Sequence, residues 1–429
     1  MKTTIIPNEG VASPEAASST LLARLGRRLL LGQLAKIRSG ELTVVDGAQR
    51  LRFGQRDARC ALAATLTVTH PRFWTLAAFS GTVGVGESYI EGDWRCDDLT
   101  ALVRIVLSND EMMSTVDNGL ARAAQPLLRL VHWLQGNSRR GSARNIAAHY
   151  DLGNDFYALM LDETMAYSCG IFTRPEASLA DASRAKFDNA CRRLELRPDD
   201  HLLEIGTGWG GLAIHAAQHY GCRVTTTTIS REQHRYAVDH IRALGLEHRI
   251  EVLLQDYRDL QGQYDKLVSI EMIEAVGANY LDTYLNKCAS LLKDSGAMLL
   301  QAITLQDQFY ERALRTVDFI QRFVFPGSFI PSINAISASL RRATDLKIFH
   351  LEDIGPHYAR TLELWRRNFH ARLADVRRLG FQDSFVRLWE FYLSYCEAGF
   401  AERRLGDIQV LLARPRYRGQ AGIPAGLPA

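Results

Sequence analysis

Hydrophobic and polar residues follow different patterns in the two halves of the chain. Between residues 41 and 90, short segments such as LTVVDG and ATLTVTH alternate with period two, which predicts half-buried strands. Beyond residue 200, apolar runs such as LLEI and YDKLVSI alternate with helical segments. This βαβ rhythm predicts an α/β fold, a doubly wound Rossmann-like sheet with helical insertions, preceded by a smaller α+β N-terminal domain.

Changes in composition indicate where these domains begin and end. At 429 residues the chain is longer than one hydrophobic core usually supports, so we expect two domains. The basic, polar segment QGNSRRGSARN interrupts the pattern and is typical of a linker. The expected order is a disordered N-terminus (1–20), an N-terminal domain (21–135), a linker (136–148), the α/β domain (149–415) and a flexible tail (416–429).

Residues 21–37, LLARLGRRLLLGQLAKI, combine leucines at helical spacing with interleaved arginines and a lysine. This pattern predicts a basic amphipathic helix. Its leucines either pack on the neighbouring part of the chain or dock on an anionic membrane surface. The second alternative makes 21–135 a lipid-associating domain.

Composition narrows the class of protein. With 51 basic and 48 acidic residues the net charge is +3, which gives no reason to expect a nucleic-acid partner. No apolar run reaches the roughly 20 residues needed to span a bilayer. The seven cysteines contain no CxxC pair, so we expect free thiols, a reducing compartment and no metal site. The expectation is a cytoplasmic protein, peripherally associated with the inner face of the membrane; a homodimer is compatible with the sequence.

The segment LLEIGTGWGGLAIHAA, residues 202–217, places glycines at a strand-to-helix turn. Gly206, Gly208 and Gly210 allow the backbone to approach a ligand closely, which suits a nucleotide. A dinucleotide is one alternative. The acidic Glu204 just before the glycines would repel its pyrophosphate, but it suits a cationic, zwitterionic ligand such as S-adenosylmethionine.

The next two strand ends carry further candidate cofactor residues. TTTTIS ends the second strand of the sheet, where a ribose would lie, and QDYRD follows the third. Asp256 is placed to accept the adenine amino group, and Tyr257 to stack on the ring. Ligands of open α/β sheets gather at the carboxyl ends of the strands, so these segments are expected to meet.

Several longer motifs are distinctive: GVGESYIEGDW, HYDLGNDFYALMLDETMAYSCGIF, EIGTGWGGLA, TISREQ, LQDYRD, SIEMIEAVG, DFIQRFVFPGSFIPS and YCEAGF. Together they resemble the cyclopropane-fatty-acyl-phospholipid synthase family, whose members use S-adenosylmethionine to modify unsaturated acyl chains. The similarity covers nearly the whole chain from about residue 80 to 412.

The resemblance implies two sets of site residues. The cofactor set is Tyr167, Ser168, Gly206, Thr228, Gln233, Asp256 and Tyr257. The second set holds a bicarbonate ion in the acyl pocket and acts in catalysis; it comprises Cys169, Glu274, Tyr358, the backbone N–H of Ile303 and a histidine. This chain reads QAIT where the family commonly has HTIG, so Gln301 replaces that histidine. An amide can donate a hydrogen bond but cannot titrate, so we expect weaker bicarbonate binding.

The chemistry that the resemblance implies needs a cation-stabilising pocket and a base. Methylation of an alkene leaves a carbocation, which aromatic faces stabilise and a bound anion deprotonates. A set of aromatic residues could form that pocket or simply belong to the core: Tyr310, Phe319, Phe323, Phe325, Trp365 and Phe369. Cys169 is expected to be an anion ligand rather than a nucleophile.

Three functions follow from these observations. The first is formation of a cyclopropane on an unsaturated phospholipid acyl chain. The second is a methyl-branched or methylene chain, which slower deprotonation at Gln301 would favour because the cation has time to shift. The third is a non-catalytic lipid-binding protein, which the intact YSC, MIEAVG and glycine motifs argue against.

Overall fold

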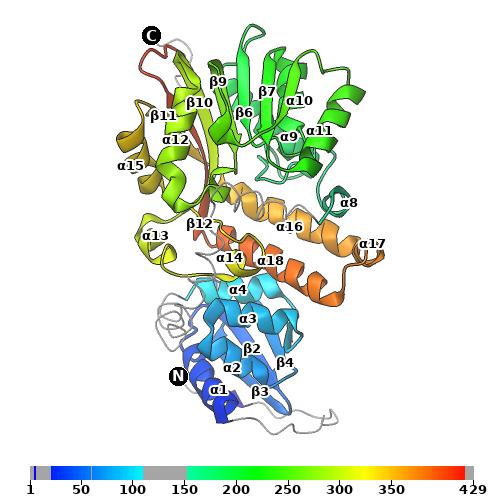
Figure 1. Cartoon of the computed structure of the whole chain (residues 1–429). Coiled ribbons are helices and arrows are strands. Elements are labelled where there is room, and N and C mark those ends of the chain that lie inside the picture. Colours follow the sequence, from blue (N-terminus) through cyan, green and yellow to red (C-terminus); the bar gives the residue numbers. More distant parts are fainter. Residues whose placement is uncertain (1–3, 6–20, 59, 110–151, 421–429) are drawn as a thin grey trace. The chain divides into compact units, whose positions relative to one another are not determined.

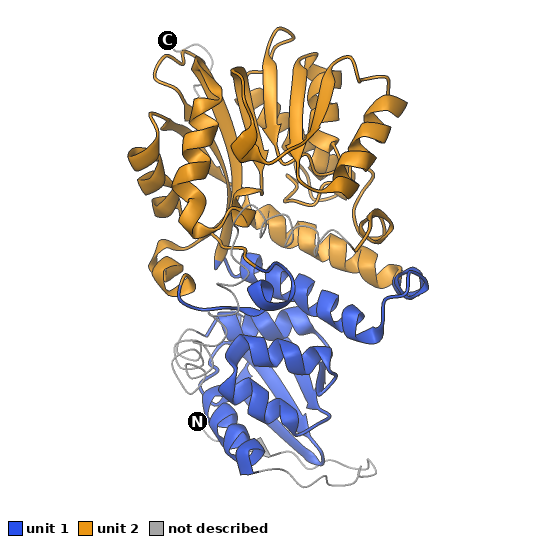
Figure 2. Ribbon diagram, viewed as in Figure 1, with its two compact units in different colours: residues 1–134, 315–326, 373–404 blue, residues 135–314, 327–372, 405–429 orange. Residues whose placement is uncertain are grey.

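The computed structural model describes residues 4–5, 21–58, 60–109 and 152–420, which fall into two compact units (Figures 1 and 2). Unit 1 comprises 1–134, 315–326 and 373–404, and unit 2 comprises 135–314, 327–372 and 405–429. The division is not continuous in sequence, because two segments from the region expected to form the α/β domain belong to unit 1. The predicted linker 136–148 lies outside the described residues.

Unit 1 contains a five-stranded sheet in the order β1-β3-β2-β4-β5. The strands are β1 (Thr4–Ile5), β2 (Gly40–Asp46), β3 (Gln49–Gln55), β4 (Ala63–Val68) and β5 (Trp94–Cys96). β2 and β4 are parallel and the other neighbours are antiparallel. The period-two prediction is confirmed. The prediction of disorder over 1–20 was wrong for Thr4–Ile5, because these residues pair with β3.

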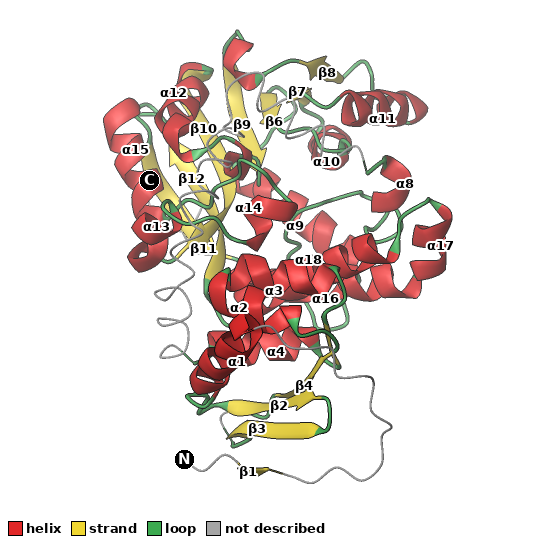
Figure 3. Cartoon of the chain, turned by 60° about the horizontal axis from the view of Figure 1, so that its bottom comes forward, coloured by secondary structure: helices red, strands yellow, loops and turns green. Residues whose placement is uncertain are grey.

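Helices from three parts of the sequence pack with this sheet in the described residues of unit 1. They are α1 (Leu21–Leu34), α2 (Arg72–Phe79), α3 (Gly81–Ile90), α4 (Leu99–Leu107), α14 (Phe319–Phe323), α17 (Leu373–Arg378) and α18 (Asp383–Ala401). Figure 3 shows α1 to α4 on one face of the β2-β3-β4 sheet. The Tyr89 hydroxyl donates to Glu390 at 2.8 Å and Arg104 donates to Glu402 at 2.7 Å, so α18 packs on α3 and α4.

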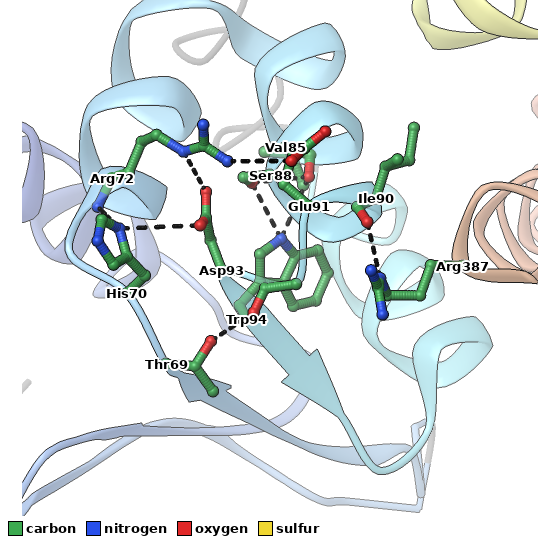
Figure 4. A network of polar contacts seen from close by, with 11 residues as sticks. Thr69, His70, Arg72, Val85, Ser88, Ile90, Glu91, Asp93, Trp94 and Arg387 are labelled. Carbon is green, nitrogen blue, oxygen red and sulfur yellow. Dashed lines mark hydrogen bonds and ion pairs between the residues drawn. The ribbon is translucent and has the colours of Figure 1, made fainter. Parts of the chain in front are cut away.

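The motif GVGESYIEGDW has a structural role in unit 1 (Figure 4). Asp93 accepts a hydrogen bond from Arg72 Nε at 2.7 Å, and Trp94 Nε1 donates to Ser88 Oγ at 3.1 Å. Arg387 of α18 donates to the carbonyl of Ile90 at 2.7 Å. These contacts hold the end of α3 to β5, to the start of α2 and to α18.

Unit 2 is built on a seven-stranded sheet in the order β11-β12-β10-β9-β6-β7-β8. The strands are β6 (His201–Ile205), β7 (Arg223–Thr228), β8 (Ile250–Leu254), β9 (Tyr264–Ile270), β10 (Leu292–Leu305), β11 (Lys347–Asp353) and β12 (Leu405–Ala413). The strands β10, β9, β6, β7 and β8 are parallel, whereas β12 and β11 add antiparallel pairs at one side of the sheet. This is the predicted Rossmann-like sheet; β11 was not predicted.

Successive residues of the central strands point into two different cores, as a doubly wound sheet requires. Leu202 and Leu299 pack with α9, α10 and α11, and Leu203 and Leu300 pack with α12 and α15. Within its described residues, unit 2 has the helices α8 (Asn154–Tyr157), α9 (Leu179–Arg193), α10 (Gly211–Tyr220), α11 (Arg231–Ala243), η2 (Tyr257–Asp259), η3 (Ile273–Ala275), η4 (Ala278–Tyr280), α12 (Leu281–Ser290), α13 (Asp307–Ala313), α15 (Ile333–Ala343) and α16 (Gly355–Ala371).

The end of the described chain is packed rather than loose. Tyr417 is 7% exposed, its ring lies 5.4 Å from that of Phe349, and its hydroxyl contacts Glu195 at 3.3 Å. The prediction of a flexible tail was therefore wrong for 416–420, and 421–429 lie outside the described residues. No helix in the described parts of the chain is long and apolar enough to cross a membrane.

Candidate active site

The glycine-rich turn after β6 has the conformation that the sequence predicts. Gly206, Gly208 and Gly210 have φ angles of 106°, 51° and 91°, in the region that side chains rarely tolerate. Helix α10 begins directly after them, at Gly211. A Cβ atom added at Gly208 would meet no atom within 4 Å, so this backbone borders open space that a ligand can enter.

The neighbouring strand ends bring the other predicted cofactor residues to the same edge of the sheet. β7 ends at Thr228, whose hydroxyl donates to Gln233 Oε1 at 2.9 Å. Asp256 and Tyr257 follow the end of β8. Because β6, β7 and β8 are parallel neighbours, their carboxyl ends lie side by side, as predicted.

Two of these side chains have protein partners of their own. Asp256 accepts hydrogen bonds from Arg258 Nε and Nη2 at 2.8 and 2.6 Å. Tyr257 packs edge-on against Tyr284 with ring centroids 5.3 Å apart, and the Arg258 guanidinium lies 5.4 Å from its ring centroid. The adenine contacts expected of Asp256 and Tyr257 stay predictions.

Glu204, which the sequence suggested as a partner for a cationic ligand, is a buried residue of the sheet. It lies inside β6, is 5% exposed and accepts a hydrogen bond from the Thr226 hydroxyl at 2.6 Å. Burial raises the pKa of its carboxyl to about 8, although the Thr226 hydrogen bond and the charge of Lys186 oppose the shift. At neutral pH this raised pKa favours the protonated carboxyl, and the role expected of Glu204 toward a cationic cofactor stays a prediction.

A series of aromatic rings runs from the glycine turn to Tyr358 on α16. Trp209, within the turn, contacts Tyr157 with ring centroids 5.1 Å apart, and Tyr157 contacts Tyr167 at 5.2 Å. Tyr167 packs on Trp365 at 5.1 Å, and Trp365 meets Tyr358 edge-on at 6.1 Å. The series connects the predicted cofactor turn with the predicted anion ligands.

The aromatic set expected around the acyl chain is divided between the units. Its members in unit 2 are Tyr310, Trp365 and Phe369. Phe319, Phe323 and Phe325 belong to unit 1, where Phe319 lies 4.5 Å from the ring of Phe391 and Phe325 lies 6.0 Å from that of Tyr392. The core interpretation accounts for these three residues.

The predicted anion ligands converge on Glu271, a residue that the sequence analysis did not single out. Its Oε1 accepts hydrogen bonds from the Cys169 N–H and from Gln301 Nε2, both at 2.8 Å. Its Oε2 accepts one from the Tyr358 hydroxyl at 2.6 Å. The structure thus brings Cys169, Gln301 and Tyr358 together, around a carboxyl group of the chain itself.

Glu274 and Ile303, the other predicted anion ligands, contact each other. The Ile303 N–H donates to Glu274 Oε1 at 2.6 Å, while Glu274 Oε2 is buried with no hydrogen-bond partner among the described residues. Burial, and next the negative charge of Glu271, raises the pKa of Glu274 to about 8. Glu274 is therefore mainly protonated at neutral pH.

Asp407 on β12 is the third carboxyl group of this cluster. Gln301 Nε2 donates to Asp407 Oδ2 at 2.9 Å. Burial, and next the charge of Glu271, raises the pKa of Asp407 well above its usual value. Burial also raises the pKa of Glu271, but its three hydrogen-bond donors and the ammonium of Lys186 oppose the shift. The proton shared by these two groups therefore rests on Asp407, and Glu271 carries the negative charge.

Lys186 and Cys169 are two further buried residues next to this cluster. Lys186, on α9, is fully buried and its Nζ donates to Ser168 Oγ at 2.6 Å. Burial raises the pKa of the Cys169 thiol well above its usual value, with the negative charge of Glu271 adding to the effect. A neutral thiol is a poor nucleophile, and the anion-ligand role expected for Cys169 stays a prediction.

The bicarbonate ion implied by the resemblance does not fit this donor set. The Cys169 N–H, the Tyr358 hydroxyl and the Gln301 amide already bind Glu271, and the Ile303 N–H binds Glu274. A second anion here would have to displace a carboxyl group from its donors. We therefore assign no step to bicarbonate.

Polar side chains fix the orientation of Gln301. Its Oε1 accepts a hydrogen bond from Gln409 Nε2 at 2.9 Å, and Gln409 Oε1 accepts one from Asn189 Nδ2 at 2.8 Å. The strand register places Gln301 directly opposite Gln409 on β12. With its carbonyl satisfied in this way, the amide of Gln301 must turn its N–H groups toward Glu271 and Asp407.

Sequence reasoning missed Glu271, Asp407, Lys186 and Gln409. A usable signal existed only for Glu271, the first of two carboxylates that follow an apolar strand in SIEMIE. The other three come from α9 and β12, far away in sequence, and nothing in their local pattern marks them.

Residues 137–410 match the protein family described as mycolic acid cyclopropane synthetase. The tuberculostearic acid methyltransferase of Mycobacterium tuberculosis is 39% identical over 353 residues, covering 78% of this chain and 79% of that protein. The cyclopropane-fatty-acyl-phospholipid synthase of Escherichia coli is 33% identical over 353 residues, covering 82% and 88%. A solved mycolic acid cyclopropane synthase, complexed with SAH and CTAB, matches with a TM-score of 0.59 at 30% identity, covering 63% of this chain and 98% of that one.

Proposed function

The chain belongs to the mycolic acid cyclopropane synthetase family, and on this basis we propose that it methylates the cis double bond of an unsaturated phospholipid acyl chain. It is an S-adenosylmethionine-dependent methyltransferase with a Rossmann-like α/β fold. The observation that carries the proposal is the aromatic series, which joins the glycine turn to a buried cluster of carboxyl groups.

The glycine turn and its neighbours suit S-adenosylmethionine. The open backbone at Gly208 leaves room for a ligand, and the Thr228–Gln233 pair lies at the next strand end. Tyr167 and Ser168 come from the loop before α9. When bound, S-adenosylmethionine supplies an electrophilic methyl group. The residues named here would hold it at the carboxyl edge of the sheet.

The remaining residues act on the acyl chain. Attack of the alkene on the methyl group leaves a carbocation, which the faces of Tyr167 and Trp365 can stabilise by about 0.5–2 kcal/mol each. Loss of a proton from the transferred carbon then closes a cyclopropane ring. This product agrees with the name of the Escherichia coli relative.

A methyl-branched or methylene product is the second candidate. It is favoured by Gln301, which cannot relay a proton, and by similarity to a tuberculostearic acid methyltransferase. If deprotonation is slow, hydride migration moves the cation to the carbon that bears the new methyl group. Loss of a proton from the transferred carbon then forms a methylene group. Alternatively, a reductant supplies hydride to the cation and gives the saturated branch.

Helix α1 supports peripheral contact with an anionic membrane at the cytoplasmic face. Its buried residues include Ala23 and Gly26, and a Cβ at Gly26 would lie 2.3 Å from the Trp74 carbonyl oxygen. Leu34 is buried as well, but other leucines of the helix are not: Leu21 is 81% exposed and Leu25 is 47% exposed. Apolar side chains left uncovered beside arginines suit insertion between anionic headgroups.

Mass spectrometry of lipids tests the proposed function. The protein is incubated with S-adenosylmethionine and vesicles of a phospholipid that has one cis double bond per acyl chain. We expect each modified chain to gain one CH₂ unit, or one CH₂ unit and two hydrogens if a reductant completes a saturated branch. NMR then distinguishes a ring from a methylene group. Unchanged acyl chains, with active cofactor present, would contradict the proposal.

A further inference from the structure

We propose that the side-chain carboxylate of Glu271 is the built-in base of this site, which removes the proton from the acyl-chain cation without a bound inorganic anion. This inference rests on the proposed function and identifies a catalytic residue for it. It starts from the observation that the groups expected to hold an external anion instead hold Glu271.

The donors around Glu271 form a complete anion-binding shell. Two hydrogen bonds of 2.8 Å reach Oε1, from the Cys169 backbone and the Gln301 amide, and one of 2.6 Å reaches Oε2 from Tyr358. These contacts stabilise the ionised form of a buried carboxyl group. The ring of Tyr358 contacts Trp365, so the carboxylate lies at the end of the aromatic series that begins at the glycine turn.

The backbone conformation of Glu271 also supports a functional role for this residue. Its φ angle is 47°, in the left-handed region that favours glycine. Its N–H donates to the Gln301 carbonyl at 2.9 Å, which fixes the chain directly after β9. A residue held in an unfavourable conformation by surrounding hydrogen bonds is typical of an active site.

Gln301 is the positioning residue in this arrangement. Its amide gives one hydrogen to Glu271 and one to Asp407, while Gln409 occupies its carbonyl. An amide suits this place because its Nε2 carries two hydrogens for two carboxyl groups. Gln301, which stands where the family commonly has histidine, therefore holds Glu271 through a direct hydrogen bond.

The step balances without an oxidant or reductant. The C–H bond of the transferred carbon breaks, and its electron pair forms the new carbon–carbon bond that closes the ring or completes the methylene group. The proton passes to a carboxylate oxygen of Glu271, which becomes a neutral acid. Return of that proton to solvent restores the carboxylate for the next turnover.

The test removes the side chain and offers an external anion in its place. Glu271→Gly suits the left-handed backbone and empties the donor shell, so we expect turnover in bicarbonate-free buffer to fall about 100-fold, the scale of a lost general base. Added bicarbonate should restore at least a tenth of the wild-type rate and raise the melting temperature of this variant. Wild-type protein should show neither response.

Two further variants make the result specific. Glu195 also has a positive φ, of 50°, and lies near Tyr417, away from the site, so Glu195→Gly should keep wild-type turnover and show no bicarbonate response. Glu271→Gln keeps the shape of the side chain, so it should lose turnover but should not respond to bicarbonate, because its amide still fills the donor shell.

Clear outcomes would overturn the inference. One is wild-type turnover that needs bicarbonate; another is Glu271→Gly that keeps full turnover in bicarbonate-free buffer. If the wild type methylates no lipid at all, the proposed function fails. The melting-temperature measurement still decides whether the donors around residue 271 form an anion-binding shell. A Glu271→Gly variant that bicarbonate does not stabilise would then contradict an anion shell around residue 271.

Discussion

Glu204 and Glu271 are both glutamates at the carboxyl ends of neighbouring parallel strands, yet their surroundings give them opposite charge states. Glu204 accepts one hydrogen bond, from Thr226, and burial raises the pKa of its carboxyl to about 8. Glu271 accepts three and carries the negative charge of its cluster. The number of donors around a buried carboxyl group thus decides its role, and that number is a property of the fold.

Glu204 makes stability depend on pH in a predictable direction. Its pKa is raised from about 4.3 in the unfolded chain to about 8 in the folded protein. Below about pH 4.3 Glu204 therefore does not reduce the free energy of unfolding, and between about pH 4.3 and about 8 the reduction grows as pH rises. Glu204→Gln cannot titrate but keeps an acceptor for Thr226. We therefore expect the unfolding free energy of the variant to fall less steeply with pH than that of the wild type, with slopes that differ by up to about 1.4 kcal/mol per pH unit. Urea unfolding at several pH values measures this; equal slopes would contradict the assignment.

Gly208 tests the placement of the cofactor. Gly208→Val puts a branched side chain in the open space beside the turn and forces a strained φ, so we expect at least a tenfold loss of S-adenosylmethionine affinity by calorimetry. Gly245→Val is a matched control, because Gly245 also has a positive φ, of 68°, with nothing within 4 Å of an added Cβ. Undiminished affinity in Gly208→Val, or an equal loss in both variants, would contradict the site.

The sequence predicted those site residues that local patterns mark. Gly206, Gly208 and Thr228 follow apolar strands, and strand ends can be recognised from periodicity alone. Lys186 and Asp407 could not be found in this way, because α9 and β12 bring them to the site from distant parts of the chain. Their chemistry depends on burial, which a single sequence does not display at isolated positions.

At the level of secondary-structure elements, the hydrophobic pattern predicted the strands of both sheets except β1, β5 and β11. Strand β11 has mostly exposed or half-buried residues and lacks a clear two-residue pattern, so its segment was included in a helical region. Helix α1, in contrast, was predicted correctly, but the sequence did not show which face of the helix packs on the rest of the unit. Its small residues Ala23 and Gly26 make the close contact, and several leucines stay exposed.

The exposed leucines of α1 can be tested without disturbing its packing. Leu25→Ser combined with Leu29→Ser should weaken binding to anionic vesicles about tenfold or more, because inserting a leucine is worth about 1.5 kcal/mol or more. Leu244→Ser with Leu379→Ser is the control, since these leucines are 42% and 44% exposed but lie outside α1. Vesicle sedimentation measures the affinity, and equal binding by both double variants would exclude α1 as the membrane contact.

In the whole molecule, the two compact units do not correspond to the two halves of the sequence. Residues 373–404 leave the α/β domain to pack in unit 1, where Glu390 and Glu402 of this segment bind Tyr89 and Arg104. Such long-range pairing carries no local signal, so the sequence suggested a single boundary near the linker. A truncation at that boundary would uncover the face of α18 that packs on α3 and α4.

The most direct measurement follows the transferred methyl group itself. S-Adenosylmethionine with a fully deuterated methyl group is incubated with the protein and vesicles of a monounsaturated phospholipid, and the acyl chains are analysed by mass spectrometry. Transfer to the double bond followed by proton loss to Glu271 predicts acyl chains that keep two of the three deuterium atoms on the new carbon. Acyl chains without deuterium would contradict methyl transfer to lipid, and products that keep all three deuterium atoms would contradict deprotonation of the transferred carbon.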